Sequence, residues 1–400
     1  MARQLRLLVG TRISKPKQVP MPYRHLFFIR SQGESTLSQP ISACIMTKNE
    51  QDNIGACIDS VKPYVKEIII VDTGSEDDTV KIAISKNVRV HQMEWKNDFS
   101  IVRNEMIKIA TQPIILMIDA DERVLPNQEE SFRDTCNLLF DDHDKIGRVT
   151  ILNEQENKET LKSSISRIFK NSSSFSYAGA IHEQIQSESS NTTYFQSGIT
   201  LEHKGYLNSS LIAKDKYERN LSLLFNELKN ARNGSYINFQ IGRTYYVMGE
   251  NKKAIDYLKE VYHEELLNQP YYSTVIQIYG WALLKEKNYS ELFNLLQRGI
   301  ELYPDYTDLY YLFGCTLIEM KSAEYVYLIP ETFQTCIELG EPDSNKYETV
   351  EGVGSFKARY NLGLYYELTH QIDKAVVEYR LSASENFKLA TARLEKIILA

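Results

Sequence analysis

The sequence predicts an α/β fold with a doubly wound, mostly parallel sheet, followed by an all-α solenoid of paired helices. Two observations predict it. Between residues 41 and 120, apolar runs that suit buried strands alternate with single helices, and strands joined in this way pair in parallel through right-handed crossovers. After residue 211 the patterns are helical throughout, and they repeat.

Seven elements account for the first pattern. Each strand is assigned from a short apolar run and each helix from apolar residues three or four positions apart. The expected strands are residues 41–46, 67–71, 88–93 and 114–118, and the expected helices are residues 53–62, 77–85 and 99–110. The more polar segment that follows is assigned to the acceptor half of the same domain, with strand-like pieces at 149–152, 164–169 and 199–202.

Glycines at the expected contacts between paired helices mark the repeat in the second half. Gly242, Gly280, Gly314 and Gly363 lie 38, 34 and 49 residues apart, so the third unit carries an insertion. Tetratricopeptide repeats have a period of about 34 residues. Helix pairs that bury their faces only against neighbouring pairs form a curved array with a concave groove. Such a groove holds an extended peptide or a partner subunit, unless the repeats serve only dimerisation or rigidity.

These patterns divide the chain into a basic N-terminal arm at 1–40, a sheet domain at 41–208 and a helical repeat domain at 209–400. The arm holds seven Lys and Arg residues before the first acidic residue, Glu34. We expect it to be a solvated segment, and docking to an acidic peptide or a membrane surface is the alternative.

Composition excludes several classes of function. A net charge of −7 and a pI near 5.7 argue against a nucleic-acid partner, which would need clustered Lys and Arg. The five cysteines are widely spaced and form no C-x-x-C pair, so neither a disulfide framework nor a zinc site is indicated. No apolar run approaches the roughly 18 residues of a membrane span. We therefore expect a cytoplasmic protein, and exposed repeat faces are compatible with a homodimer.

Paired carboxylates follow the fourth expected strand. Asp119 and Asp121 come directly after an apolar run and are two positions apart. Alternate residues of an extended chain lie on the same side, so both carboxylates are expected at the carboxyl edge of the sheet, where ligands of open α/β sheets bind. Carboxylates suit a divalent cation with attached phosphates. An ordinary turn is the alternative for so short a motif.

Polar segments also follow the other three strands, at 47–50, 72–75 and 98–104, so four elements line one crevice. Asp72 is placed to accept a hydrogen bond from a base or a ribose hydroxyl. The glycine-rich motifs of dinucleotide and P-loop sites are absent. We therefore expect a metal bridged to Asp121, rather than a glycine cradle, to neutralise a diphosphate.

The order and spacing of four motifs make residues 41–206 resemble family 2 glycosyltransferases of the GT-A fold, a Rossmann-like architecture. The motifs are Thr-Lys-Asn-Glu at 47–50, Val-Asp-Thr-Gly-Ser-Glu-Asp-Asp-Thr at 71–79, Trp-Lys-Asn-Asp-Phe-Ser at 95–100 leading to Arg103-Asn104, and Ile-Asp-Ala-Asp-Glu at 118–122. Within that family the chain is similar to the sublancin-type, or glycocin, peptide S-/O-glycosyltransferases. The features that carry this closer similarity are the repeat tail, Trp-Lys-Asn-Asp-Phe-Ser at 95–100, Ile181-His182-Glu183 and His203-x-Gly205-Tyr206.

The resemblance implies an inverting, metal-dependent transfer of a hexose, glucose from UDP-glucose, to Cys or Ser of a small bacteriocin precursor peptide. The donor-binding residues that it implies are Thr47, Glu50 and Asp72 at the uracil and ribose, Asp119 at the ribose or sugar, and Asp98, Arg103 and Asn104 around them. Asp121 would bind Mg or Mn between the phosphates. His203 would be a further metal or diphosphate ligand.

The general base is the residue that the motifs mark least clearly, because the usual Glu-Asp base pair of family 2 is absent. His182 and Glu183 occupy a comparable place after the metal motif. We assign Glu183 as the base, with His182 as the second candidate. A cysteine acceptor, with a reference pKa of about 8.5, needs less help from a base than a serine hydroxyl does.

Two other functions fit the same sequence. In the first, the enzyme acts on a saccharide or a lipid-linked glycan, although the chain lacks a basic amphipathic helix for membrane binding. In the second, the chain is a repeat scaffold whose sugar-transfer domain is inactive. The intact Asp119-Ala120-Asp121 motif argues against the second.

Overall fold

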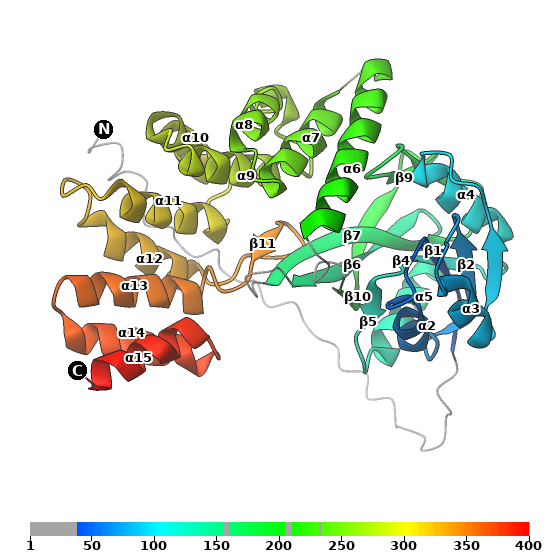
Figure 1. The fold of residues 1–400 in the computed structure, drawn as a ribbon, viewed down its shortest axis with the longest axis horizontal. Coiled ribbons are helices and arrows are strands. Elements are labelled where there is room, and N and C mark those ends of the chain that lie inside the picture. Colours follow the sequence, from blue (N-terminus) through cyan, green and yellow to red (C-terminus); the bar gives the residue numbers. More distant parts are fainter. Residues whose placement is uncertain (1–37, 155–159, 205–209, 232–233, 400) are drawn as a thin grey trace.

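The computed structural model describes residues 38–154, 160–204, 210–231 and 234–399. It has two lobes side by side: one is built on a mixed sheet, and the other consists mainly of helices (Figure 1). Helix α6 (Ser210–Asn230) stands where the two lobes meet. The predicted basic arm lies almost entirely outside the described residues, and the first strand already begins at Gln39.

The first four strands form the predicted parallel sheet, in the order β3-β2-β1-β4. They are β1 (Gln39–Thr47), β2 (Val65–Asp72), β3 (Arg89–Gln92) and β4 (Ile114–Asp119), and they are connected by α2 (Ile54–Val61), α3 (Thr79–Ser85) and α4 (Phe99–Ile109). All seven predicted elements are confirmed, each with bounds within two residues of the prediction.

Beyond β4 the sheet is mixed. The order continues through β7 (Thr160–Lys170), β6 (Lys145–Glu154), β10 (Thr193–His203) and β5 (Glu122–Val124). Strand β7 is antiparallel to both β4 and β6, whereas β10 runs parallel to β6. The three strand-like pieces of the acceptor half are confirmed as parts of β6, β7 and β10. The sequence analysis did not identify β5, α5 (Glu129–Asp141) or the hairpin of β8 (Phe175–Ala178) and β9 (Gln184–Ser187).

Strand β4 is buried on both faces. Its side chains point alternately to one face and the other, so alternate residues pack against different helices. Leu116 and Ile118 pack into a core with residues of α2, α3 and α5, whereas Ile115 and Met117 pack on the other face with residues of α4 and the β8–β9 hairpin. Asp119 is next in the second series. Its carboxylate is therefore directed toward α4 and the hairpin.

The helical lobe consists of consecutive helix pairs: α7 (Ser235–Val247) with α8 (Asn251–Lys259), α9 (Tyr272–Lys285) with α10 (Tyr289–Leu302), α11 (Thr307–Met320) with α12 (Leu328–Leu339), and α13 (Phe356–Leu368) with α14 (Ile372–Ser384), followed by α15 (Lys388–Leu399). The repeat glycines lie at the contacts within these pairs. A Cβ atom on Gly314 would lie 2.6 Å from the ring of Phe333, and one on Gly363 would lie 2.7 Å from Tyr379. The glycines therefore permit the close packing that the sequence predicted.

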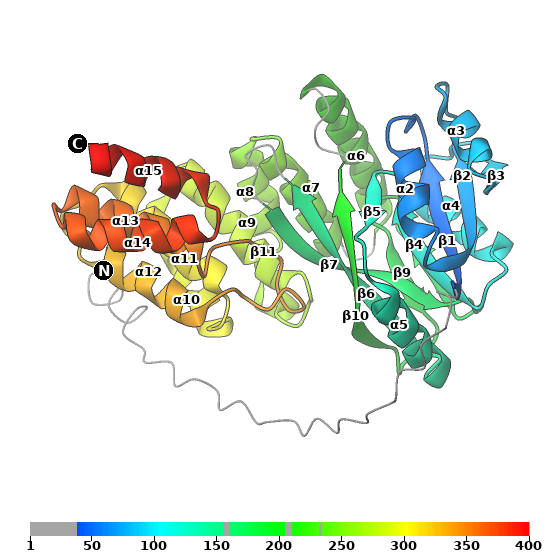
Figure 2. The ribbon, with the colours of Figure 1, turned by 90° about the horizontal axis from the view of Figure 1, so that it is seen from below.

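The insertion in the third repeat unit contains a strand, so the helical lobe is not purely α. Strand β11 (Thr349–Val350) pairs antiparallel with β7 and lies at the junction of the lobes (Figures 1 and 2). Next to it, Glu348 accepts two hydrogen bonds from Arg243 of α7, at 3.0 and 2.7 Å. The lobes are thus joined by sheet pairing as well as by the chain. A division between residues 208 and 209 stays a prediction, because 205–209 are not described.

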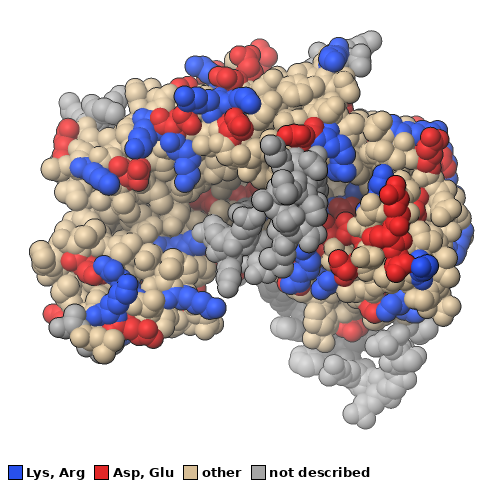
Figure 3. Space-filling view, in the orientation of Figure 1, with Lys and Arg blue, Asp and Glu red and all other residues tan. Residues whose placement is uncertain are grey.

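Among the described residues, every helix is too short or too polar to cross a membrane. In Figure 3, Asp and Glu side chains gather on the sheet lobe, and Lys and Arg are interspersed with acidic groups on the helical lobe.

Asp308 of α11 makes the stability of the helical lobe depend on pH. Its buried carboxylate accepts hydrogen bonds from Gln277 at 2.8 Å and from the N–H of Val350 at 3.0 Å. Burial raises the pKa of Asp308 to about 7, even though these bonds act to lower it. A carboxyl whose folded pKa is raised stabilises the fold fully below its unfolded pKa of about 4 and loses that contribution as the pH rises through 7.

We predict that Asp308→Asn flattens the pH profile of stability. Between pH 5 and pH 8, the free energy of unfolding in urea should fall by roughly 2–3 kcal/mol less in this variant than in the wild type, because the amide does not ionise. Asp373→Asn, at an exposed position of α14, is the control and should follow the wild type. Equal slopes for wild type and Asp308→Asn would contradict the assignment.

Candidate active site

The carboxyl ends of three neighbouring parallel strands bring the predicted polar segments together. Thr47 at the end of β1 lies opposite Asp72 at the end of β2, and on the other side of β1, Met46 lies opposite Asp119 at the end of β4. The expected crevice edge therefore exists. The side chains along this edge differ in their hydrogen-bond and ion-pair partners.

Asp72 shapes its own loop. Its buried carboxylate accepts hydrogen bonds from the backbone N–H groups of Gly74 at 3.1 Å and Ser75 at 3.0 Å. Gly74 has a φ of 103°, a conformation that favours glycine. The loop then joins the one after β1, since the N–H of Asn49 donates to Ser75 Oγ at 2.8 Å and Asn49 Oδ1 accepts from the N–H of Glu76 at 2.8 Å.

Thr47 and Glu50 occupy the loop after β1. The Oγ1 of Thr47 is buried and has no hydrogen-bond partner among the described residues. The N–H of Glu50 donates to Thr79 Oγ1 at 2.7 Å, and its carboxylate accepts from Asn53 at 2.8 Å, at the start of α2. Of the three residues predicted at the uracil and ribose, Thr47 therefore has a buried hydroxyl that could form a hydrogen bond with a ligand.

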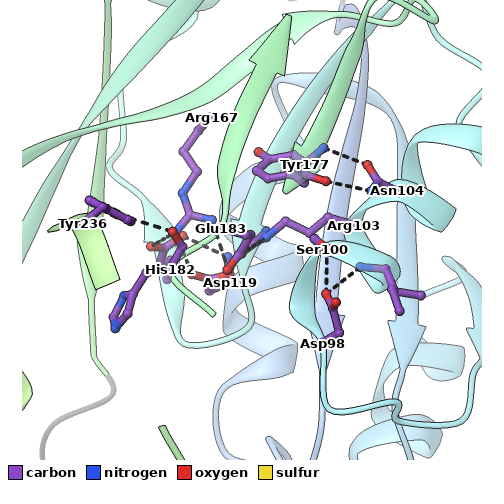
Figure 4. Close-up of polar contacts among 12 residues, drawn as sticks. Asp98, Ser100, Arg103, Asn104, Asp119, Arg167, Tyr177, His182, Glu183 and Tyr236 are labelled. Carbon is purple, nitrogen blue, oxygen red and sulfur yellow. Dashed lines mark hydrogen bonds and ion pairs between the residues drawn. The ribbon is translucent and has the colours of Figure 1, made fainter. Parts of the chain in front are cut away.

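Two arginines hold Asp119. Arg103 of α4 donates from Nη2 to Oδ1 at 2.9 Å, and Arg167 of β7 donates from Nη2 to Oδ2 at 2.6 Å (Figure 4). Burial acts to raise the pKa of Asp119, but the positive charges of Arg167 and Arg103 outweigh it and hold that pKa well below its ordinary value. The carboxylate is therefore fixed and ionised.

Arg103 connects three elements. Its Nε donates to Glu183 Oε1 in the loop between β8 and β9, while Nη2 bonds Asp119, and the guanidinium lies 5.4 Å from the centre of the Tyr177 ring (Figure 4). Burial acts to lower the pKa of Arg103, but the charges of Glu183 and Asp119 raise it well above the ordinary value. The sequence placed Arg103 at the donor. In the structure its side chain organises the carboxylates around it.

Arg167 and Tyr177 also belong to this site, although neither is among the predicted site residues. Arg167 stands in the string Ser-Ile-Ser-Arg-Ile-Phe, where a charged residue on the buried face of a strand requires a partner inside the protein. That signal could have identified Arg167. Tyr177 had no such signal, because it comes near Arg103 only when the β8–β9 hairpin folds over α4.

Glu122 closes the same network. Its carboxylate accepts from the N–H of Asp119 at 2.9 Å and from Arg167 at 3.2 Å. Burial raises the pKa of Glu122 to about 7 in spite of the charge on Arg167, and the negative charge of Asp119 adds to the rise. Near neutral pH, Glu122 is therefore present in both its protonated and its ionised form.

Asp121 has a different partner from Asp119. His203 at the end of β10 approaches it, with Nε2 3.0 Å from Oδ2, and each of these side chains is 14% exposed. The chain turns at Ala120 and enters β5, which carries Asp121 toward β10. The expectation that an extended backbone places both carboxylates on the same side is thus corrected, whereas their binding of one ligand stays a prediction. Gly205 and Tyr206 of the predicted string lie outside the described residues.

The Asp121–His203 pair fits a cation that is shared with a substrate. In the described part of the chain, no three His, Cys, Asp or Glu side chains gather as a complete metal site. Mg or Mn in nucleotide sites is held by one or two protein ligands and takes its remaining ligands from phosphates and water. One carboxylate and one imidazole are sufficient for such a site.

His182 and Glu183 lie in the tip of the β8–β9 hairpin, residues 179–183. The ring of His182 is exposed and points away from the Arg103–Glu183 pair (Figure 4). The surrounding protein lowers the pKa of His182 to about 4, and the charge of Arg243 adds to this effect. At neutral pH the ring of His182 is therefore uncharged.

Asp98 and Asn104 support α4. The carboxylate of Asp98 caps the helix by accepting from the N–H of Ile101 at 3.1 Å and from Ser100 Oγ at 2.6 Å. The amide of Asn104 bonds both backbone groups of Tyr177, at 2.8 and 2.9 Å (Figure 4). The sequence analysis expected both residues around the donor. Their hydrogen bonds use Oδ1 of Asp98 and the amide of Asn104, and direct contact of the two residues with the donor stays a prediction.

Comparisons with known proteins agree with this geometry. Residues 42–136 match Glycosyl transferase family 2. SPbeta prophage-derived glycosyltransferase SunS of Bacillus subtilis is 28% identical over 295 residues, which cover 72% of this chain and 69% of that protein. A TPR repeat-containing protein of Synechococcus elongatus is 27% identical and covers 55% and 56%. An uncharacterized glycosyltransferase of Rickettsia felis is 35% identical and covers 27% and 36%.

We predict that Arg167→Lys lowers the free energy of unfolding by about 1–3 kcal/mol, because an ammonium cannot reproduce the guanidinium fork that bonds Asp119 and Glu122. Urea unfolding is the measurement. Arg148→Lys, on neighbouring β6, is the matched control: Arg148 lies over the ring of Tyr194 at 4.8 Å, and its replacement should change stability by less than about 0.5 kcal/mol. If both variants unfold alike, Arg167 does not hold the network together.

Proposed function

We propose that this chain, a glycosyltransferase whose residues 42–136 form a family 2 domain, transfers a hexose from a UDP-sugar to a Cys or Ser side chain of a small bacteriocin precursor peptide. The proposed donor is UDP-glucose, and the proposed cofactor is Mg or Mn. The reaction inverts the anomeric centre by direct displacement.

The observation that carries the proposal is the position of the Asp121–His203 pair at the crevice edge, beside the fixed carboxylate of Asp119. A cation between Asp121 and His203 would contact the diphosphate. Asp119 keeps 35% of its side-chain surface open to solvent although both arginines bond it, so it can still accept from a sugar or ribose hydroxyl. Thr47, with its unused hydroxyl, and the Asp72 loop are assigned to the uracil and ribose.

The chemistry then divides among named groups. The acceptor sulfur or oxygen attacks the anomeric carbon, and the bond from that carbon to the UDP oxygen breaks. When bound, the cation stabilises the negative charge of the departing diphosphate. Glu183 takes the acceptor proton: Arg103 holds its Oε1, and its Oε2 remains for the proton. His182, which is neutral at pH 7, is the second candidate.

We assign the peptide to the helical lobe. The hairpin tip that carries both candidate bases adjoins α7, where the hydroxyl of Tyr236 donates to the carbonyl oxygen of His182 at 3.4 Å. A peptide in a groove formed by the helix pairs would therefore end close to the proposed base. A saccharide or lipid-linked glycan acceptor is the second candidate. It requires no helical repeat lobe next to the hairpin tip.

We predict that Asp121→Asn lowers hexose transfer by at least about 100-fold, because the amide removes the charge that holds the cation. The assay incubates the full chain with UDP-glucose, Mn and a cysteine-containing peptide, and the mass of the peptide reports the hexose. Asp141→Asn, at an exposed position of α5, is the control and should be unaffected. Transfer that persists in a chelator, or in Asp121→Asn, contradicts the metal site.

The same assay separates the acceptors. If no cysteine- or serine-containing peptide gains a hexose while saccharides do, the glycan acceptor is correct. If calorimetry with Mn detects no binding of UDP-glucose, the chain is an inactive scaffold.

We predict that Glu183→Gln discriminates between acceptors. Loss of a general base should slow transfer to serine by about 10²–10⁴-fold, and transfer to cysteine less, because a thiol with a pKa of about 8.5 ionises without help. In this variant, raising the pH from 7 to 9 should restore transfer to cysteine but not to serine. His182→Gln is the comparison. If His182→Gln lowers the rate of transfer to serine more than Glu183→Gln does, His182 is the general base and Glu183 is not.

A further inference from the structure

The hairpin tip at 179–183 carries both candidate bases, yet much of what holds it comes from outside the sheet lobe. Both backbone groups of Ala180 are used. Its carbonyl oxygen accepts from the N–H of Phe99 in α4 at 2.9 Å, and its N–H donates to Glu227 of α6 at 3.2 Å. Ala180 therefore lies between a helix of the sheet lobe and the helix at the junction.

The next two residues are held by the helical side. Ile181 is 7% exposed and packs in an apolar cluster with side chains of α6 and α7, among them Leu224 and Ile241. The carbonyl oxygen of His182 accepts from the hydroxyl of Tyr236 in α7. Three consecutive residues thus contact α6 or α7.

The tip needs such support because its backbone is not relaxed. Gly179 has a φ of 105° and His182 a φ of 51°, and a non-glycine residue in this region costs about 1 kcal/mol or more. At the base of the hairpin, Asn104 fixes Tyr177. Asn104 thus holds the base of the hairpin and α6 and α7 hold its tip, and in this arrangement Glu183 pairs with Arg103.

We propose that helices α6 and α7 complete the active site by holding the hairpin tip, so that Glu183 stands against Arg103. Glu227 and Tyr236 are the positioning residues. They act through the backbone groups of Ala180 and His182. The role of Glu183 in this inference depends on the proposed function, whereas the contact between the lobes does not. The helical lobe is then part of the catalytic geometry as well as an acceptor platform.

The test compares variants of the full chain by hydrogen exchange and kinetics. Glu227→Ala removes the acceptor of the Ala180 N–H, and Glu227→Gln keeps an acceptor oxygen. Ser222→Ala, at an exposed position of the same helix, is the matched control. In Glu227→Ala, the amides of residues 179–184 should exchange about three- to tenfold faster, with wild-type rates in Glu227→Gln and Ser222→Ala.

The kinetic result should follow the exchange. In Glu227→Ala, kcat for hexose transfer should fall about three- to tenfold while KM for UDP-glucose stays within twofold, and Glu227→Gln should restore kcat. Tyr236→Phe gives a second, independent variant that keeps the ring. Its control is Tyr271→Phe, whose ring lies 5.2 Å from that of Tyr236.

Two results overturn the proposal: unchanged exchange in both Glu227→Ala and Tyr236→Phe, or faster exchange with unchanged kcat. If the wild-type chain transfers no hexose to any acceptor, the proposed function fails. The exchange rates then still decide whether α6 and α7 hold the tip, so the two failures are distinguishable.

Discussion

The structure of the site depends on carboxylates that balance the positive charges of two buried arginines. Arg103 and Arg167 are 5% and 8% exposed, and a buried charge without a partner costs several kcal/mol. Asp119 pairs with both of them, Glu183 pairs with Arg103, and Glu122 pairs with Arg167. Because Glu122 has a pKa of about 7, it can take up the proton that balances the charges. Helix α4, strands β4 and β7 and the β8–β9 hairpin are fixed to one another through this set of ion pairs.

The two aspartates of the motif have different partners, so we assign them different roles. Asp119 belongs to the face of β4 that packs on α4, so its charge is used to order the protein. Asp121 comes after the turn, and its contact is His203 at the end of β10. Among the described residues no arginine pairs with Asp121, which makes it the carboxylate that we propose for the cation. Asp119 ends β4, and Asp121, two positions later, lies in the turn before β5.

Most features that depend on interactions between residues close in sequence were predicted correctly, and side-chain contacts that depend on distant residues were not. The seven strands and helices up to residue 119 depend on local periodicity, and they were predicted within two residues. The partners of Asp119 depend on contacts 16 and 48 residues away, which no local pattern encodes. The same holds for Asn104, whose amide looked available in the sequence and is used by a backbone 73 residues away. Only Arg167, a charge on a buried strand face, signalled its need for a partner.

Strand β7 explains why the repeat array contains an insertion that breaks its period. Inside the sheet, β7 carries Arg167 to Asp119, and at its other end it pairs with β11 from the insertion. Glu348, next to β11, holds Arg243 on α7, the helix that also contacts His182. Strand β11 and Glu348 thus attach α7 to the sheet lobe in addition to α6 and to the contacts that α7 makes with the hairpin tip. With the insertion, one strand sets the position of both the carboxylate network and the helix beside the hairpin tip.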